Sequence, residues 1–129
     1  MTDQRIRATN ATNAPGRYSR AVIAGGVVYM AGQTGFGLDG EPIAPGDPAV
    51  QARQACENIK KLIAEAGGDL SHVVKLTTYV TDRAHREPVY AVIAEYFGEH
   101  APASTGLIID GMAHPQMLIE IDATAVLPG

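Results

Sequence analysis

The chain has 129 residues, a length that fits one domain (residues 1–129) with a core large enough to need no disulfide or metal. Hydrophobic residues make up 46% and charged residues 19% of the chain, which excludes a disordered protein. The net charge is −4 and the sequence holds no basic run. This balance disfavours nucleic acid as a partner, because nucleic-acid grooves gather Lys, Arg and aromatic side chains.

The first residues and the single cysteine indicate a cytoplasmic protein. The segment "MTDQRIRATNATN" is polar and has no apolar stretch of signal-peptide length. No apolar run approaches the length of a membrane span, so we expect no membrane association. Cys56 has no second cysteine with which to form an internal disulfide.

A β-hairpin is the first predicted element, within "RYSRAVIAGGVVYMAGQTG". Two apolar runs, residues 21–24 and 27–31, flank Gly25-Gly26. Glycine supplies the positive φ that tight hairpin turns require. The next segment, "FGLDGEPIAPGDP", is rich in turn formers and is predicted to be a loop.

A helix is predicted between Asp47-Pro48 and Gly67-Gly68. Asp47 suits the N-cap and Pro48 the first helical position, while the glycines suit the end. Cys56 falls in this helix, where we expect it to be a core or half-buried residue. Apolar residues recur along it at helical spacing: Ala52, Ala55, Ile59, Leu62, Ile63 and Ala66.

The segment "HVVKLTTYVTD" predicts a strand, because it alternates and is rich in β-branched residues. The alternation places Val73 on one face with Lys75, Thr77 and Tyr79, and Val74 on the other with Leu76, Thr78 and Val80. A second helix is expected to begin near Pro88 and to end at Gly98.

The C-terminal part predicts a turn and two strands. Residues 102–106 of "APASTGLIID" look like a turn, followed by a short strand in "GLIID". "QMLIEIDATAV" alternates, with Ile119 and Ile121 on one face and Glu120 and Asp122 on the other.

This order of elements predicts an α+β fold, with a mixed sheet and both helices on one face. The other face of the sheet would then be free. If it also carried Leu118, Leu76 or Val28, it would favour an oligomer partner.

Glu120 and Asp122 are the candidate catalytic pair, roughly 7 Å apart along one strand face. Paired carboxylates can act as acid and base, although a solvated sheet face would explain them as well. The histidines are scattered and show no metal-ligand spacing. Ser104 lies in no nucleophile motif, and the Gly-rich residues 31–40 lack the Lys of a phosphate-binding loop.

Several segments together resemble the Rid family of reactive intermediate deaminases, also called the YjgF or L-PSP family. They are "GRYSRAV", "VVYMAGQTG", "QARQACENIKKLIAEAGGDLSHVVKLTTYVTD", "EYFGEHAPAST" and "HPQMLIEIDATAV". The resemblance runs in order from about Ala14 to Val126. It implies a chorismate-mutase-like fold with a mixed six-stranded sheet and two helices. It also implies a homotrimer with a cleft between each pair of neighbouring subunits.

The resemblance also implies an activity, the hydrolysis of small enamines and imines left by pyridoxal-phosphate enzymes. The products are a keto acid and ammonia, and the family uses no metal or organic cofactor. The protein's task would be to hold the substrate, polarise the imine and place one water.

Five residues match positions that serve the ligand in the family. Tyr18 matches the tyrosine of its G-x-Y-S motif, and Gly32 matches the glycine of its "SGQ". Glu120 matches the glutamate of "IEIEA" that positions the attacking water. Thr105 and Gly106 match residues whose backbone contacts the ligand carboxylate.

Three positions depart from the family pattern. Ser104 stands where the "PARS" motif has its carboxylate-binding arginine. A serine cannot reproduce the bidentate, charge-assisted contact of a guanidinium. Tyr90 stands in the place of an asparagine, and Arg17 replaces a frequent proline and is a candidate substitute for the missing cation.

These features leave several functions open. The first is a divergent Rid-type hydrolase or deaminase acting on a small imine or enamine in an intersubunit cleft, with Glu120 placing the water. The second is a deaminase of a larger enamine such as 2-aminomuconate. The third is a non-catalytic, ligand-binding or chaperone-like trimer. Endoribonuclease activity is disfavoured by the acidic charge.

Overall fold

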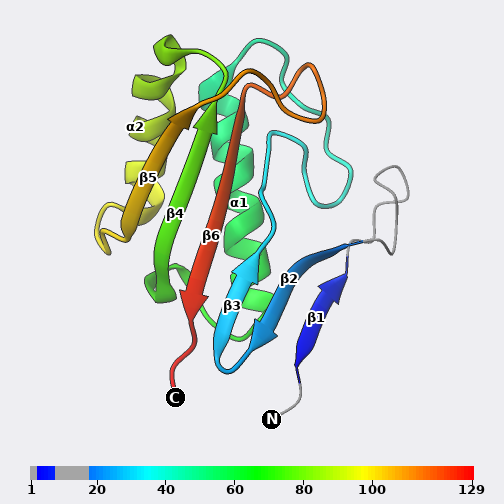
Figure 1. Cartoon of the computed structure of the whole chain (residues 1–129), viewed down its shortest axis with the longest axis vertical. Helices are drawn as coiled ribbons and strands as arrows, with labels where there is room; N and C mark the ends of the chain where they lie inside the picture. The colour runs from blue at the N-terminus through cyan, green and yellow to red at the C-terminus, as the bar shows by residue number, and fades with distance from the viewer. Residues whose placement is uncertain (1–2, 8–17) are drawn as a thin grey trace.

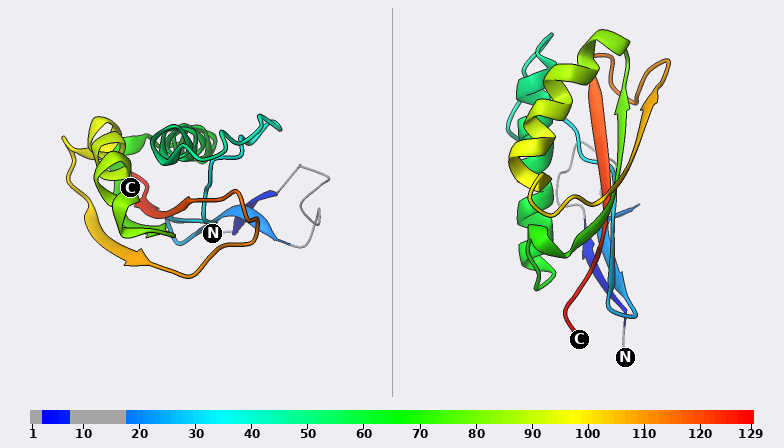
Figure 2. Two further views of the ribbon diagram at one scale, coloured as in Figure 1. Left: turned by 90° about the horizontal axis from the view of Figure 1, so that it is seen from above. Right: turned by 90° about the vertical axis from the view of Figure 1, so that its left-hand side faces the viewer.

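The computed structural model describes residues 3–7 and 18–129. They form one six-stranded sheet with two helices on one face (Figures 1 and 2), as predicted. None of the helices in this part of the chain is long and apolar enough to span a membrane. The helices are α1 (Pro48–Glu65) and α2 (Arg86–Phe97), and the strands are β1 (Gln4–Arg7), β2 (Ser19–Ala24), β3 (Val27–Met30), β4 (Val73–Val80), β5 (Ala103–Ile108) and β6 (Ile119–Val126).

The strand order is β1-β2-β3-β6-β4-β5, and only β4 and β5 run parallel. This parallel pair is joined through α2, as a crossover connection requires. The β2–β3 hairpin is confirmed, with Gly25 and Gly26 at φ values of 59° and 79°. The central strand β6 therefore joins the hairpin to the two crossover strands.

Helix α1 confirms the predicted caps and apolar stripe. The carboxylate of Asp47 accepts a hydrogen bond from the backbone N–H of Val50 at 3.1 Å. Gly67, at φ 95°, takes the left-handed conformation that follows the end of the helix. Cys56 is fully buried in the core, and this burial raises the pKa of its thiol to about 12.

Helix α2 begins at Arg86, two residues before Pro88, so the predicted start is slightly late. Asp82 caps a short 3₁₀ turn, Arg83–His85, by accepting from the N–H of Ala84. This turn leads directly into α2, and Pro88 still lies within the first helical turn, where it removes no helical hydrogen bond.

Two local predictions were wrong. Residues 103–106 are not a turn but the first part of β5, which pairs in parallel with β4 (Leu76 with Ser104, Thr78 with Gly106). Their structure comes from hydrogen bonds to a distant strand, which a local pattern of turn formers does not reveal. The strand β1 was also absent from the pattern reading, because its sequence "QRIR" has only one apolar side chain for the core, Ile6.

A bulge in β4 overturns the predicted faces at its start. The register against β6 shifts between Val73 and Lys75, so Val73 is buried and Val74 is exposed. Leu76 and Val28 do not lie on the free face of the sheet, because both are buried beneath the helices. The free face carries other apolar side chains instead, with Tyr29 53%, Val126 48% and Val74 47% exposed.

Candidate active site

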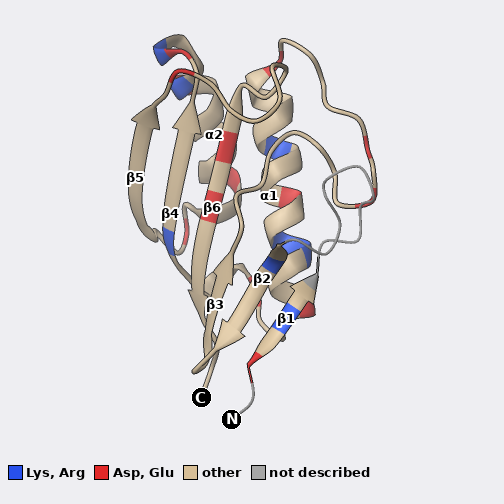
Figure 3. Ribbon diagram, turned by 45° about the vertical axis from the view of Figure 1, so that its right-hand side comes forward, with Lys and Arg blue, Asp and Glu red and all other residues tan. Residues whose placement is uncertain are grey.

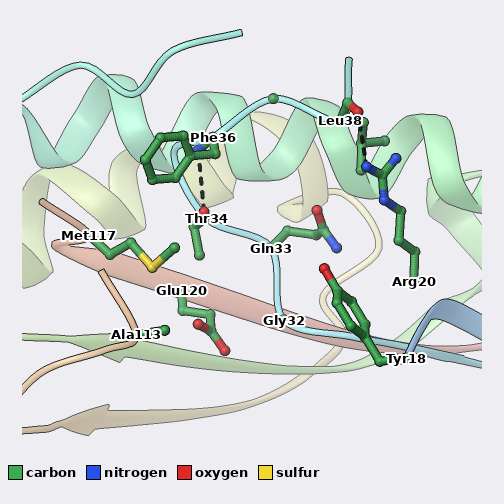
Figure 4. Close-up of a pocket in the computed structure, with 11 residues that line it drawn as sticks. Tyr18, Arg20, Gly32, Gln33, Thr34, Phe36, Leu38, Ala113, Met117 and Glu120 are labelled. Atoms are coloured by element: carbon green, nitrogen blue, oxygen red, sulfur yellow. Dashed lines mark hydrogen bonds between the residues drawn. The ribbon is translucent and has the colours of Figure 1, made fainter. Parts of the chain in front are cut away.

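A cavity of about 380 Å³ lies where the chain leaves β3 and passes the start of β6 (Figure 4). Its walls are formed by both polar and apolar side chains. The lining residues are Tyr18, Arg20, Gly32, Gln33, Thr34, Phe36, Gly37, Leu38, Ala113, Met117 and Glu120. Three of the predicted site residues, Tyr18, Gly32 and Glu120, therefore meet in one cavity.

Glu120 lies near the start of β6, on the face opposite the helices. Its neighbours Ile119 and Ile121 are fully buried in the core, and the strand alternation turns Glu120 the other way. The side chain is half-buried, and this burial raises the pKa of its carboxyl group. The charge of Asp122 raises the pKa further. Glu120 is therefore a stronger base than an ordinary surface glutamate.

Gly32 leaves the space that the Glu120 carboxylate occupies. A Cβ atom added at Gly32 would lie 2.1 Å from Oε2 of Glu120 and 2.6 Å from its Cδ. The chain around Gly32 is held against β6 by a pair of backbone hydrogen bonds between Gln33 and Ile121, both at 2.8 Å. A larger residue here would require the Glu120 side chain to move from its present position.

Asp122 is engaged by a tyrosine and is not a free second carboxylate. The hydroxyl of Tyr79 donates a hydrogen bond to Oδ2 of Asp122 at 3.0 Å. This bond to the carboxylate raises the pKa of Tyr79. Both carboxylates share a face as predicted, but only Glu120 lines the cavity. Asp122 acts on the site through its charge.

Two buried amides of α1 hold the loops around the cavity, and the sequence reading missed both. The Gln51 side chain donates to the carbonyls of Ala44 (2.8 Å) and Gln116 (3.0 Å) and accepts from the N–H of Leu118 (2.9 Å). Asn58 donates to the carbonyl of Phe36 at 2.8 Å. The available signal was their place beside Ala52 and Ile59, on the buried side of the helix.

The predicted residues Ser104 and Tyr90 lie in a second hollow, of about 240 Å³, between β5 and α2. Apolar residues such as Leu76, Ile93 and Phe97 form most of its walls. This hollow is on the helix side of the sheet, because Ser104 pairs with the buried Leu76. Within one chain it is separate from the cavity of Glu120.

Gly106 and Thr105 lie beside this hollow on opposite faces of β5. A Cβ at Gly106 would lie 2.1 Å from the hydroxyl oxygen of Tyr90, so glycine admits the tyrosine. The guanidinium of Arg86 stacks on the ring of Tyr90, 5.1 Å from its centroid. Thr105 points to the other face, where its hydroxyl accepts a hydrogen bond from Lys75. Arg17 lies outside the described residues.

The charges of the described chain do not outline a binding surface for a polyanion. Figure 3 shows the acidic positions of β6 in the middle of the sheet, with Lys and Arg scattered over different elements. No group of His, Cys, Asp and Glu within residues 3–7 and 18–129 is arranged to hold a metal ion. The lining of the cavity itself holds one anionic side chain, Glu120, and one cationic side chain, Arg20.

Sequence comparisons find relatives over nearly the whole length. Residues 8–127 match the family model described as Endoribonuclease L-PSP. A RutC family protein of Pyrococcus horikoshii is 38% identical over 116 residues, which cover 90% of this chain and 91% of the relative. Protein DfrA of Myxococcus xanthus is 33% identical and covers 98% of this chain and 97% of its own.

Solved structures share the fold as well. RidA from an Antarctic Psychrobacter superposes with a TM-score of 0.83 at 31% identity, covering 98% of this chain and 99% of its own. A YjgF/YER057c/UK114 family member from Mycobacterium tuberculosis gives 0.86 at 30% identity, covering 98% and 100%. The fold, the motifs and these matches agree, and the chain belongs to the L-PSP family, also known as the Rid or YjgF family.

Proposed function

We propose that this protein hydrolyses a small imine or enamine metabolite to a carbonyl compound and ammonia. The observation that carries the proposal is the half-buried carboxylate of Glu120, with its raised pKa, fitted against Gly32 in a cavity of metabolite size. A general base needs a suitable pKa and access to the reacting water, and the raised pKa of Glu120 and its place in the cavity lining support this role.

Glu120 acts first as a base and then as an acid. It takes a proton from water while the water oxygen bonds to the imine carbon and the C=N electron pair moves to nitrogen. The same proton is then returned to nitrogen, which gives a carbinolamine. Glu120 next takes the proton of its hydroxyl group and delivers it to nitrogen, so that the C–N bond breaks and ammonia leaves as the carbonyl forms. An enamine enters the same sequence after one proton is added to its terminal carbon and one is lost from its nitrogen, which converts it to the imine.

Tyr18 and Gly32 position the reacting groups. Tyr18 is 43% exposed at the rim of the cavity, and its ring points inward beside Gln33 (Figure 4). Its hydroxyl can donate a hydrogen bond to the substrate, and no resident cofactor is part of the proposal. Gly32 leaves room for the Glu120 carboxylate, which a side chain at this position would displace, and a small displacement of the base would weaken catalysis strongly.

The working form is proposed to be a homotrimer with clefts between subunits. The apolar free face, with Tyr29, Val74 and Val126 exposed, is a surface that burial against other copies would stabilise. The hollow of Ser104 and Tyr90 lies apart from Glu120 within one chain. Ser104, Thr105, Gly106 and Tyr90 would therefore serve a cleft only through a neighbouring subunit.

The proposal is tested with 2-iminopropionate, generated in situ by an amino-acid oxidase and trapped by semicarbazide when it is not hydrolysed. The wild type should reduce the trapped imine, and Glu120→Gln should not. Glu65→Gln, an exposed glutamate on α1, is the matched control and should equal the wild type. A wild-type rate equal to the uncatalysed rate would favour a non-catalytic, ligand-binding trimer.

A further inference from the structure

The hydroxyl of Tyr79 makes the two carboxylates of β6 unlike each other. In the pairing of β4 with β6, Tyr79 lies opposite Glu120, and Thr77 lies opposite Asp122. The Tyr79 hydroxyl nevertheless reaches past its direct neighbour and donates to Oδ2 of Asp122, at 3.0 Å. An aromatic side chain is long enough for such a diagonal contact between antiparallel strands. Within the described part of the chain, no group donates a hydrogen bond to Glu120.

The two carboxylates compete for protons because they lie close together. Glu120 and Asp122 are two residues apart on one face of a strand, which places them roughly 7 Å from each other. Two negative charges at this separation repel, so the ionisation of one carboxylate makes the other harder to ionise. A hydrogen bond to a carboxylate favours its charged form. The structure gives that bond to Asp122 and not to Glu120.

We propose that Tyr79 is a positioning residue for the hydrolysis, because its bond to Asp122 directs the proton for which the two carboxylates compete to Glu120. This inference rests on the proposed function and adds a residue to its site. The base must return to the substrate the proton that it takes from water, so the proton has to stay on the carboxylate that lines the cavity. Asp122 lies outside that lining, and a proton held there would be lost to the reaction.

The other titratable or charged side chains near the pair do not take this part. They are Tyr29 on β3, Lys75 on β4, Tyr18 and Arg20 in the cavity lining, and Asp110 and His114 in the loop before β6. Within residues 3–7 and 18–129, none of them forms an ion pair or a hydrogen bond with Glu120 or Asp122. Lys75 donates to the hydroxyl of Thr105, and Arg20 donates to the carbonyl of Leu38.

The experiment follows the titration of Glu120 itself and needs no turnover. Isotopically labelled carboxyl carbons are observed by NMR from pH 4 to pH 8, and the Glu120 signal is identified by its absence in Glu120→Gln. Tyr79→Phe keeps the aromatic ring and removes only the hydroxyl. Glu120 should then ionise at lower pH and over a wider pH range than in the wild type, because Asp122 holds the proton in part of the molecules.

Asp122→Asn sets the upper limit of this shift, because it removes the whole charge through which Tyr79 acts. The Glu120 titration in Tyr79→Phe should therefore move in the same direction as in Asp122→Asn, and no further. The double variant Tyr79→Phe/Asp122→Asn should titrate as Asp122→Asn alone. A double variant in which the two shifts add would overturn the proposal, because Tyr79 would then act on Glu120 without Asp122.

Tyr96→Phe is the matched control. Tyr96 on α2 also donates to a carboxylate, at 2.6 Å from Oε2 of Glu57 on α1, and this pair lies away from the cavity. Its removal should leave the titration of Glu120 unchanged. A Glu120 titration in Tyr79→Phe that equals the wild-type curve, or that moves to higher pH, would also overturn the proposal.

Failure of this inference is distinguishable from failure of the proposed function. A Glu120 titration that depends on Tyr79, with no imine hydrolysis by the wild type, would support the pairing of Tyr79 with the carboxylates and contradict the hydrolase. Imine hydrolysis in which the acid limb of kcat/KM and the Glu120 titration are both unchanged in Tyr79→Phe would contradict the role of Tyr79 and leave the hydrolase standing.

Discussion

The carboxylate of Glu120 lies where a side chain of residue 32 would be. A Cβ at Gly32 would come within 2.1 Å of Oε2, a separation that no real contact reaches. The two residues are distant in sequence and are brought together because the chain after β3 continues along β6, with Gln33 bonded to Ile121. The position of the proposed base therefore depends on a residue that has no side chain.

Replacing Gly32 by alanine should disable the site without unfolding the protein. The added methyl group must push the Glu120 carboxylate aside, and misplacement by about 1 Å can cost on the order of a hundredfold in rate. Gly111→Ala is the control, because a Cβ there meets nothing within 4 Å. The measurements are imine hydrolysis and thermal unfolding. Equal rates in the two variants would contradict the role given to Gly32.

Replacing Glu120 by glutamine should stabilise the protein at high pH. The pKa of Glu120 is raised in the folded state, so the folded protein binds its proton more tightly than the unfolded chain. The wild-type free energy of unfolding therefore falls as pH rises from the unfolded pKa through the folded pKa. Glutamine does not ionise, so the Glu120→Gln protein does not lose free energy of unfolding in this way.

Thermal unfolding of the two proteins, measured from pH 4 to pH 8, checks the direction of this change in stability with pH. The melting temperature of Glu120→Gln should exceed that of the wild type by a margin that grows with pH. Glu65→Gln, at an exposed position, should show no such growth. A margin that shrinks as pH rises would mean that the ionised Glu120 is stabilised by its surroundings.

Replacing Asp122 by asparagine should shift the pH dependence of catalysis. The charge of Asp122 contributes to the raised pKa of Glu120, and asparagine removes the charge while it can still accept from Tyr79. Because catalysis needs the ionised Glu120, the acid limb of kcat/KM should move to lower pH. An acid limb that stays in place would show that burial alone sets this pKa.

Replacing Gln51 by alanine should weaken the fold and the site together. The substitution leaves the carbonyls of Ala44 and Gln116 and the N–H of Leu118 without their partner. Each buried group left unsatisfied costs about 1–3 kcal/mol, so we expect a loss of about 3 kcal/mol or more in urea unfolding. Gln116→Ala, whose side chain is exposed, should change stability little. Similar losses in both variants would contradict this account.

The proposed homotrimer predicts the mass of the protein in solution. Analytical ultracentrifugation of the wild type should give a mass three times that of the 13.6 kDa chain. Tyr29→Lys places a charge on the apolar free face of the sheet and should dissociate the trimer. Val50→Lys is the matched control, because Val50 is 49% exposed but lies on α1, on the other side of the molecule. A wild-type monomer at micromolar concentration would contradict the trimer.

The sequence was informative wherever structure depends on neighbouring residues. The Gly25-Gly26 hairpin and the Asp47 cap each follow from a local pattern, and the structure has both. The alternation of β6 placed Glu120 opposite the core side chains. Residues 103–106 and Val74 were misassigned because pairing with a distant strand decides them, in β5 through a parallel partner and in β4 through a bulge.

The candidate site was predicted in part. Family motifs indicated Tyr18, Gly32 and Glu120, which share the cavity. Arg20 gave no signal, because an arginine in a strand next to a loop is usually a solvated side chain. The fold places it among the residues that line the cavity, with its guanidinium bonded to the Leu38 carbonyl.

The rate of 2-imino acid hydrolysis in wild type and Glu120→Gln tests the central claim most directly. The assay follows loss of the trapped imine, with Glu65→Gln as control. We predict that the wild type and the control accelerate hydrolysis equally, and that Glu120→Gln falls by at least about a hundredfold, as expected for loss of a general base. A folded Glu120→Gln protein that hydrolyses the imine at the wild-type rate would contradict the account.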